Sequence, residues 1–208
     1  MCPDVRGLHP FYKRLVLRIA SAGIVAVAID YYRRTAGLTG RDDTFEFRPH
    51  VQRLTAKHFY TDARVALDYL KAHSGTVRGG SFLLGFSTGG SLSLYTGSGE
   101  MGLAGVIVFY PVLSRTLDDR KGTVLASAER IKVPVLGLFR SDDPLVPVGQ
   151  VQQLDEQLDK AAIHHVMMTY PGVSHNFFDR KAAEFAKESA DAWERTLDFV
   201  TEQDQMVP

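Results

Sequence analysis

The chain has 208 residues, 45% of them hydrophobic, and its 24 basic and 24 acidic residues balance. This length and apolar content predict a single domain over residues 1–208 with a sizeable core, and the balanced charge argues against nucleic acid as a partner. A single cysteine excludes an internal disulfide and a metal–thiolate cluster, which suits a cytoplasmic protein. Because no apolar run approaches about 20 residues and the start has no signal-peptide layout, no membrane association is expected.

Helical and strand-like patterns alternate from the start. Apolar residues at helical spacing predict a first helix over 10–22, which Gly23 ends. The continuous apolar run 24–29 is typical of a buried parallel strand. The polar stretch 31–50 is predicted to be an irregular loop. A functional loop and a solvent-exposed loop without a role are about equally good interpretations of it. A helix is then predicted from position 55 or 61 to position 72.

The alternation continues to the end of the chain. Residues 112–131 are predicted as a loop with a short helix. The other patterns predict strands over 81–86, 104–110, 133–139 and 163–170, and helices over 88–96, 148–160 and 181–201. Such alternation favours an α/β fold with a parallel sheet covered by helices on both faces. Functional residues are then expected at the carboxyl ends of the strands.

Ser87 lies at one of these strand ends. Gly85, Ser87 and Gly89 form a G-x-S-x-G pattern between a predicted strand and a predicted helix, the arrangement of a nucleophile elbow. The glycines allow strand and helix to approach closely, while the helix N-terminus offers backbone N–H groups to a developing oxyanion. A simple Gly/Ser turn is the alternative.

Two further strand ends carry an acid and a histidine. Asp142 and Asp143 follow the strand predicted over 133–139, and His175 follows the one over 163–170. A serine needs an adjacent base, a histidine provides it, and an aspartate orients the imidazole. The order serine, acid, histidine is the one found in α/β-hydrolases. A D-D-P turn or a lone histidine is ordinary, but their conjunction with Ser87 predicts a catalytic triad.

Longer motifs surround these residues. Positions 143–147 read DPLVP, and positions 170–177 read YPGVSHNF. They resemble the D-x-x-V-P acid loop and the Y-P-G-x-x-H-x-F histidine loop of the dienelactone hydrolase family of α/β-hydrolases. The acid-loop match favours Asp143 over Asp142. The resemblance runs almost from end to end, since residues 3–7 resemble the family's oxyanion loop and residues 28–37 resemble its D-x-Y-x-R loop.

The resemblance implies further site residues. The backbone N–H groups of Val5 and Thr88 would form the oxyanion hole, and Asp4 stands where the family has an acidic residue that can pair with the nucleophile. Arginines bind a substrate carboxylate in dienelactone-type enzymes. Arg34 or Arg180 is the candidate for that role, and surface ion pairing is the alternative for both.

Two departures from the family stand out. Its best-known members have G-x-C-x-G-G in the elbow, whereas this chain has Ser87, which depends more on His175 as a base and favours general ester hydrolysis. About three strands precede the oxyanion loop in the family, whereas here the loop begins at Pro3. The sheet is therefore expected to lack the usual N-terminal strands. A missing upstream segment is the favoured explanation. Otherwise the run 24–29 would pair directly with the strand over 81–86 or with a strand from a second subunit.

No cofactor or metal is expected. His164 and His165 are adjacent in a predicted strand, so their side chains point to opposite faces. His9, His50, His58 and His73 show no ligand spacing. No G-x-G-x-x-G stretch follows a strand, so a nucleotide is not expected.

These observations predict a serine hydrolase that cleaves a small ester or lactone through an acyl-enzyme, acting as a monomer or homodimer. Two alternatives stay open. One is a catalytically silent binding protein on the same fold, and the other is an acyltransferase that uses the same triad. Labelling with a fluorophosphonate would distinguish the first, and a product assay with alcohols or thiols the second.

Overall fold

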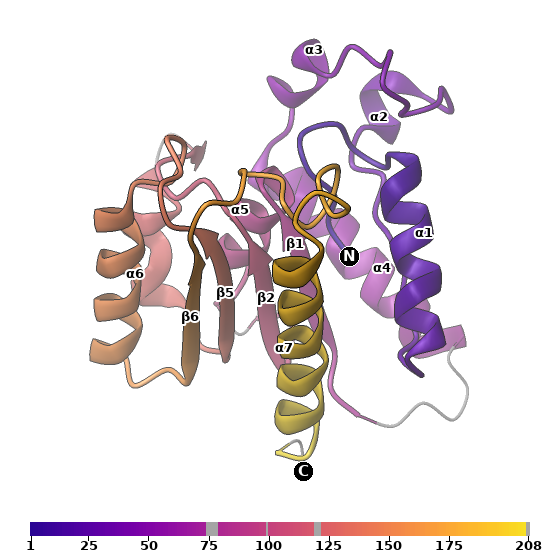
Figure 1. Cartoon of the computed structure of the whole chain (residues 1–208). Coiled ribbons are helices and arrows are strands. Elements are labelled where there is room, and N and C mark those ends of the chain that lie inside the picture. Colours follow the sequence, from indigo (N-terminus) through magenta and orange to yellow (C-terminus); the bar gives the residue numbers. More distant parts are fainter. Residues whose placement is uncertain (74–78, 99, 119–121, 207–208) are drawn as a thin grey trace.

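A four-stranded parallel sheet occupies the centre of the molecule in the computed structural model, which describes residues 1–73, 79–98, 100–118 and 122–206 (Figure 1). The strand order is β1-β2-β5-β6. These strands are β1 (Phe82–Phe86), β2 (Gly105–Phe109), β5 (Val135–Arg140) and β6 (His165–Tyr170). All five residues of β2 are buried, which explains why the strand reads as a continuous apolar run.

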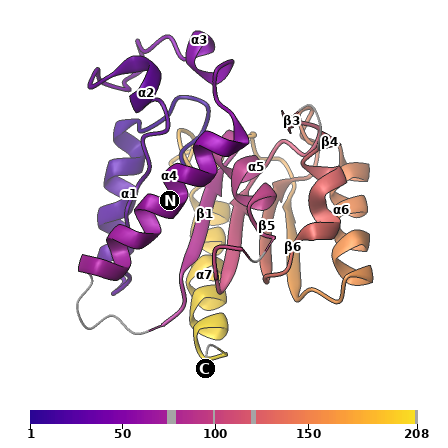
Figure 2. The ribbon, with the colours of Figure 1, turned by 180° about the vertical axis from the view of Figure 1, so that it is seen from behind.

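Helices cover both faces of the sheet. They are α1 (Pro10–Ser21), α2 (Arg33–Ala36), α3 (Arg48–Val51), α4 (Ala56–His73), α5 (Thr88–Tyr95), the 3₁₀ helix η1 (Leu125–Arg130), α6 (Val148–Lys160) and α7 (Ala186–Asp204). The apolar sides of α1 and α7 share one core cluster, and those of α4, α5 and α6 share the other. Opposite views show these two layers in front of and behind the strands (Figures 1 and 2). The predicted α/β class with a covered parallel sheet is confirmed.

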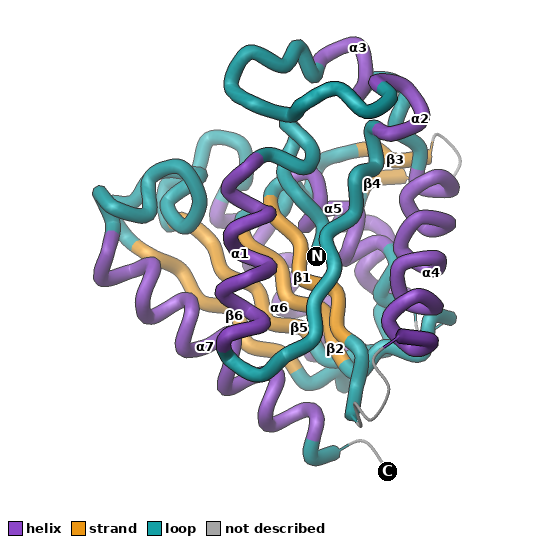
Figure 3. Tube along the Cα trace, turned by 90° about the vertical axis from the view of Figure 1, so that its right-hand side faces the viewer, coloured by secondary structure: helices purple, strands orange, loops and turns teal. Residues whose placement is uncertain are grey.

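The prediction of a strand over 24–29 is wrong as stated. This segment runs beside β1 as irregular chain (Figure 3). The segment does not pair with β1 directly, because Met1 and Cys2 lie between the segment and β1. Most of its backbone therefore has no strand as a neighbour. The Met1 amino group donates to Val27 O at 2.7 Å, and the Ile29 N–H donates to Met1 O at 3.0 Å. On the other side Cys2 forms a parallel bridge with Gly85. Residues 1–2 are too few to form a hydrogen-bonded ladder along all six residues of the segment 24–29.

Other elements differ in smaller ways. The predicted loop over 31–50 contains the short helices α2 and α3. In the region predicted as loop and short helix over 112–131, β3 (Thr116–Asp118) and β4 (Gly122–Thr123) also pair as antiparallel strands. The last helix begins at Ala186, five residues after the predicted start, because turns occupy the preceding segment. The other helices and strands agree with prediction to within a few residues.

No helix in the described part of the chain combines the length and apolar composition that crossing a bilayer requires.

Candidate active site

Ser87 occupies the sharp turn between β1 and α5. Its backbone has φ 46° and ψ −110°, a left-handed conformation that a side-chain-bearing residue rarely adopts. A Cβ on Gly85 would lie 2.5 Å from the Gly89 carbonyl oxygen, and a Cβ on Gly89 would overlap the carbonyl oxygens of Cys2 and Pro3. Both glycines are therefore required by the packing of strand, helix and N-terminal segment around the serine. The predicted elbow geometry is present.

The structure brings Ser87, His175 and Asp143 together. His175 Nε2 lies 3.0 Å from Ser87 Oγ, and His175 Nδ1 lies 2.5 Å from Asp143 Oδ2. The three side chains come from the carboxyl ends of β1, β6 and β5, three strands of one parallel sheet. This is the geometry in which a histidine accepts a serine proton while a carboxylate holds the imidazole.

Asp143 is the buried member of the adjacent pair of acids. It is 3% exposed and its Oδ1 accepts a hydrogen bond from the Leu145 N–H at 2.9 Å. Burial acts to raise the pKa of its carboxyl group, but the hydrogen bond and charge of His175 outweigh burial, and the pKa is lowered. Asp142 is exposed. The choice of Asp143 over Asp142 thus agrees with the hydrogen bonding.

The loop that carries Val5 is held beside the elbow by two tyrosines. The Tyr31 hydroxyl donates to Pro3 O at 2.8 Å and also contacts Asp4 O, and the Tyr32 hydroxyl donates to Val5 O at 2.8 Å. Thr88 is the first residue of α5, where backbone N–H groups are free of intrahelical partners. Sequence reasoning gave neither tyrosine a role, although both lie in the D-x-Y-x-R stretch.

Asp4 and Arg180 are close to each other. Asp4 is buried and accepts from the Arg6 backbone N–H at 2.9 Å and from Arg6 Nε at 3.0 Å. Arg180 Nη2 lies 3.9 Å from Asp4 Oδ2, so the histidine loop and the oxyanion loop are linked by charge. The other two guanidinium nitrogens of Arg6 are buried without a hydrogen-bond partner among the described residues. Arg6 was not singled out from the sequence.

The buried carboxylate of Asp179 is linked to the histidine through Tyr110. Asp179 Oδ2 accepts from the hydroxyl groups of Tyr12 and Tyr110, each at 3.2 Å. The Tyr110 ring centroid is 4.8 Å from that of His175. Burial is the largest cause of a raised pKa for both Asp179 and Tyr110. This network supports one side of the imidazole, and the sequence held no motif that marked it.

Arg34 is accounted for by an ion pair. Its Nη1 lies 2.5 Å from Asp62 Oδ2 in α4, which is the alternative that the sequence analysis weighed. Arg115 is a cation beside the elbow that the sequence analysis missed. Its Nη1 donates to Thr88 Oγ1 at 3.3 Å, and burial lowers the pKa of its guanidinium group.

One group of side chains has a composition that suits a metal ion. Asp155, Asp159 and His165 offer ligand atoms within 4.8 Å of one another. His165 Nε2 is 3.1 Å from Asp155 Oδ1, and its Nδ1 is 2.7 Å from Ile163 O. These hydrogen bonds explain the cluster without a metal, and it contains no member of the triad.

Known structures share this fold. A crystal structure from Klebsiella pneumoniae subsp. pneumoniae MGH 78578, titled "Putative Dienelactone Hydrolase", is similar with a TM-score of 0.82 and 20% identity over 96% of this chain and 84% of that one. A dienelactone hydrolase-like promiscuous phosphotriesterase from metagenomic libraries has a TM-score of 0.78 and 22% identity, covering 97% of this chain and 84% of that one. The fold is that of an α/β-hydrolase.

Sequence comparison identifies the family. The model of the dienelactone hydrolase family matches residues 1–203. A protein of Saccharolobus solfataricus named "Putative carboxymethylenebutenolidase" is 34% identical over 118 residues, 56% of this chain and 42% of that protein. One of the same name from Synechocystis sp. is 23% identical over 92% of this chain and 80% of that protein. The chain belongs to the dienelactone hydrolase family and is a hydrolase.

Proposed function

We propose that this protein hydrolyses a small carboxylic ester or lactone with Ser87 as the nucleophile, His175 as the base and Asp143 as the orienting acid. The observation that carries the proposal is the continuous chain of hydrogen bonds from Asp143 through His175 to Ser87, at 2.5 and 3.0 Å. Family membership supports ester or lactone bonds as the target.

The proposed reaction has two halves. Ser87 Oγ attacks the substrate carbonyl carbon as His175 Nε2 takes its proton, and Asp143 stabilises the imidazolium. When the tetrahedral intermediate collapses, the C–O bond to the leaving group breaks and His175 returns the proton to the leaving oxygen. Water then attacks the acyl-enzyme, with His175 again serving as base, and releases the acid and free Ser87.

The oxyanion would be stabilised by the N–H groups of Thr88 and Val5. The hydrogen bonds from Tyr31 and Tyr32 to this loop support the proposal, because they fix the backbone around Val5. Two cations that the fold brings to this region are Arg180, which lies near Asp4, and Arg115, which donates to Thr88. Either one is a candidate to attract an acidic group on the substrate.

The decisive test is Ser87→Ala, assayed with a p-nitrophenyl ester of a short acid. We expect kcat/KM to fall by about four orders of magnitude or more, because removal of the nucleophile leaves only binding and the oxyanion hole. Ser21→Ala, at the exposed end of α1, is the matched control and should keep full activity.

A fluorophosphonate probe provides a second readout. The unmodified protein should be labelled at Ser87, whereas Ser87→Ala should not be labelled. Unchanged ester turnover in Ser87→Ala would contradict the catalytic role. A parent protein that neither reacts with the probe nor turns over esters would favour a catalytically silent binding protein.

A further inference from the structure

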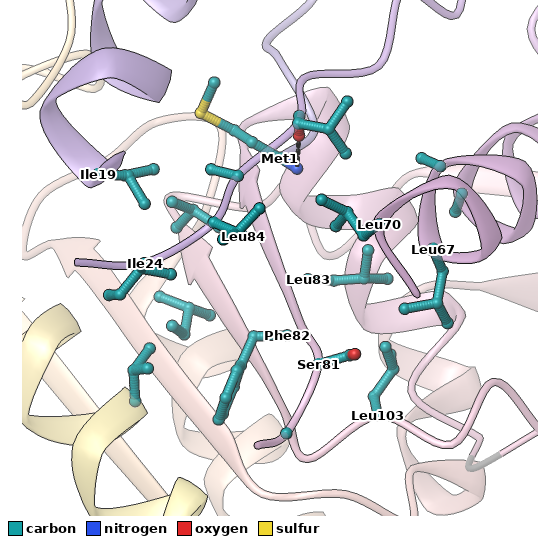
Figure 4. A pocket seen from close by; sticks show the side chains of 18 of the residues that line it. Met1, Ile19, Ile24, Leu67, Leu70, Ser81, Phe82, Leu83, Leu84 and Leu103 are labelled. Carbon is teal, nitrogen blue, oxygen red and sulfur yellow. Dashed lines mark hydrogen bonds between the residues drawn. The ribbon is translucent and has the colours of Figure 1, made fainter. Parts of the chain in front are cut away.

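An apolar cavity and a polar cluster lie on opposite edges of the sheet, both away from the triad. The cavity, of about 280 Å³, lies beside β1 and is lined mainly by apolar side chains such as Ile19 and Leu83 (Figure 4). The cluster lies between α6 and the edge strand β6, where Asp155, Asp159 and His165 converge. Of the two, the cluster presents polar atoms at short distances from one another, and these define the chemistry of a ligand.

His165 enters the cluster from the first residue of β6. Its side chain is 9% exposed and lies on the same side of the strand as Met167, which packs against the core cluster that includes α6. Its Nδ1 lies 2.7 Å from the carbonyl oxygen of Ile163. A carbonyl group can only accept a hydrogen bond, so Nδ1 carries a proton and donates it. In the neutral imidazole, Nε2 therefore has no proton and offers its lone pair to the cluster.

The lone pair of His165 Nε2 faces two carboxylates. Nε2 lies 3.1 Å from Asp155 Oδ1 and 3.9 Å from Asp159 Oδ1. Hydrogen bonds account for the cluster without a metal only while His165 is an imidazolium, because three acceptor atoms otherwise converge with no donor among them. A proton on Nε2 serves Asp155 alone, since 3.9 Å is too long for a hydrogen bond. A cation that binds all three atoms satisfies the whole cluster.

The position of the two aspartates on α6 favours a cation between them. Asp155 and Asp159 are four residues apart, so they lie on one face of the helix, where like charges repel. Asp159 is in the last turn of α6, where the helix dipole also favours positive charge. In the described part of the chain, no lysine or arginine forms an ion pair with either aspartate, and Lys160 instead pairs with Glu156. The two carboxylates are therefore left to His165 or to a bound cation.

The distances suit a small divalent ion. Zn²⁺ binds imidazole nitrogen and carboxylate oxygen at about 2.0–2.2 Å, which places tetrahedral ligand atoms about 3.3 Å apart. The three ligand atoms here lie within 4.8 Å of one another. The side chains of Asp155 and Asp159 are 49% and 75% exposed, so they are free to rotate inward over the difference. The Ile163 carbonyl already provides the outer hydrogen bond that orients a metal-bound histidine.

We propose that Asp155, Asp159 and His165 form a binding site for a divalent transition-metal ion of the Zn²⁺ type. The ligands are His165 Nε2 and one oxygen of each aspartate, and water completes the coordination. A nitrogen ligand suits Zn²⁺ better than Mg²⁺ or Ca²⁺, which prefer oxygen alone. The sequence argument against a metal weighed His164 together with His165, whereas this site takes its other two ligands from α6.

The bound ion joins two elements that lead from and to the loops of the active site. α6 starts at Val148, directly after the loop that carries Asp143, and β6 ends at Tyr170, shortly before His175. The metal site lies at the other end of both elements, where α6 ends and β6 begins (Figure 1). Its role is structural, since it contains no triad residue, and the proposal does not depend on ester hydrolysis.

The experiment is a calorimetric titration with Zn²⁺ of the full chain, untagged and freed of metal by a chelator and dialysis. We expect saturable binding of one Zn²⁺ ion per chain and a Tm that rises with Zn²⁺ concentration, because the ion binds the folded state. His165→Asn removes the nitrogen ligand, and Asp155→Asn and Asp159→Asn each remove a carboxylate. Each variant should bind Zn²⁺ at least about tenfold more weakly.

Two matched controls separate the site from general attraction of cations. His164→Asn changes the exposed neighbour of His165, and Glu156→Gln removes an exposed charge from α6. Both should bind Zn²⁺ as the parent does. If a ligand variant fails to fold by circular dichroism, NMR of the imidazole nitrogens of the parent decides, because Zn²⁺ should bind His165 Nε2 and leave the proton on Nδ1. Absence of saturable binding, unchanged affinity in all three ligand variants, or Zn²⁺ bound to Nδ1 overturns the proposal.

Discussion

At the scale of single residues, Asp142 and Asp143 show how one position along the chain decides between two chemically identical side chains. Asp143 is buried against His175 and receives the Leu145 N–H, whereas Asp142 faces solvent. Composition could not separate the two. The D-x-x-V-P spacing favoured Asp143, and the hydrogen bonding agrees with that choice.

Asp143→Asn and Asp142→Asn form a matched pair that tests this difference. We expect Asp143→Asn to lower kcat by about four orders of magnitude, because an amide no longer stabilises the imidazolium or fixes the correct tautomer. Asp142→Asn should retain activity close to that of the parent. Steady-state ester hydrolysis measures both. A large loss in Asp142→Asn alone would mean that the wrong acid has been chosen.

Asp179 is a second buried carboxylate, and it responds to pH in the opposite direction to Asp143. Burial raises the pKa of Asp179, so the folded state binds this proton more tightly than the unfolded state. Its contribution to the free energy of unfolding is therefore greatest below the unfolded pKa of about 3.9, and is lost as pH rises through the higher folded pKa.

Replacement of Asp179 by asparagine should remove the part of the stability that the parent loses as pH rises. Between pH 4 and neutrality, the stability difference between Asp179→Asn and the parent should shift in favour of the variant as pH rises. Urea unfolding at several pH values measures it. Asp198→Asn removes an exposed carboxyl group from α7 and serves as the control. A constant difference across the range would show that the pKa of Asp179 is not raised.

At the scale of elements, the start of α5 and the N-terminal segment are packed so closely that only glycine fits between them. A Cβ on Gly89 would overlap the backbone carbonyl oxygens of Cys2 and Pro3, and the same segment continues into the loop that carries Val5. Backbone atoms cannot rotate away as a side chain can, so the whole segment must move to admit a methyl group.

Gly89→Ala should therefore affect stability and activity together. We expect a loss of about 1–3 kcal/mol in the free energy of unfolding, the usual cost of overpacking, and a marked fall in kcat as the Val5 N–H is displaced. Gly149→Ala in α6 meets nothing within 4 Å. It should stay within about 1 kcal/mol of the parent, on the stabilising side. Denaturant unfolding and ester assays of both variants test the contrast.

The elements that were predicted well are those whose pattern is local. Apolar runs and helical spacing marked the four strands of the main sheet and the long helices, because burial on both faces imposes that pattern on the chain itself. The run 24–29 had the same pattern but formed no strand, since a strand also requires a partner of sufficient length. The antiparallel pair of β3 and β4 was missed because three-residue and two-residue strands leave too few positions for alternation.

At the scale of the whole molecule, the proximity of Ser87, His175 and Asp143 could be predicted because each lies in a recognisable loop at a strand end. Their catalytic role stays a proposal. The network around the three residues could not be predicted. The Tyr12 hydroxyl reaches Asp179 across 167 positions in the sequence, and Arg34 pairs with Asp62 across 28. Such contacts depend on how the layers close over the sheet. The single domain over 1–208 and the oligomeric state stay predictions.

The reactivity of Cys2 can report when the N-terminal segment detaches from the sheet. It is the sole cysteine, its side chain is fully buried in the core cluster that α4 and α5 share, and burial raises the pKa of its thiol. A thiol reagent needs an exposed thiolate, so it can react only after the first residues leave the sheet.

We expect alkylation of the native protein to be slower than that of the urea-unfolded protein by at least about 100-fold, which is a local opening free energy of about 2.7 kcal/mol or more. Equal rates would mean that the N-terminal segment is not seated in the sheet. Mass spectrometry of the labelled protein over time would therefore time the detachment of the segment that leads into the oxyanion loop, without any engineered probe.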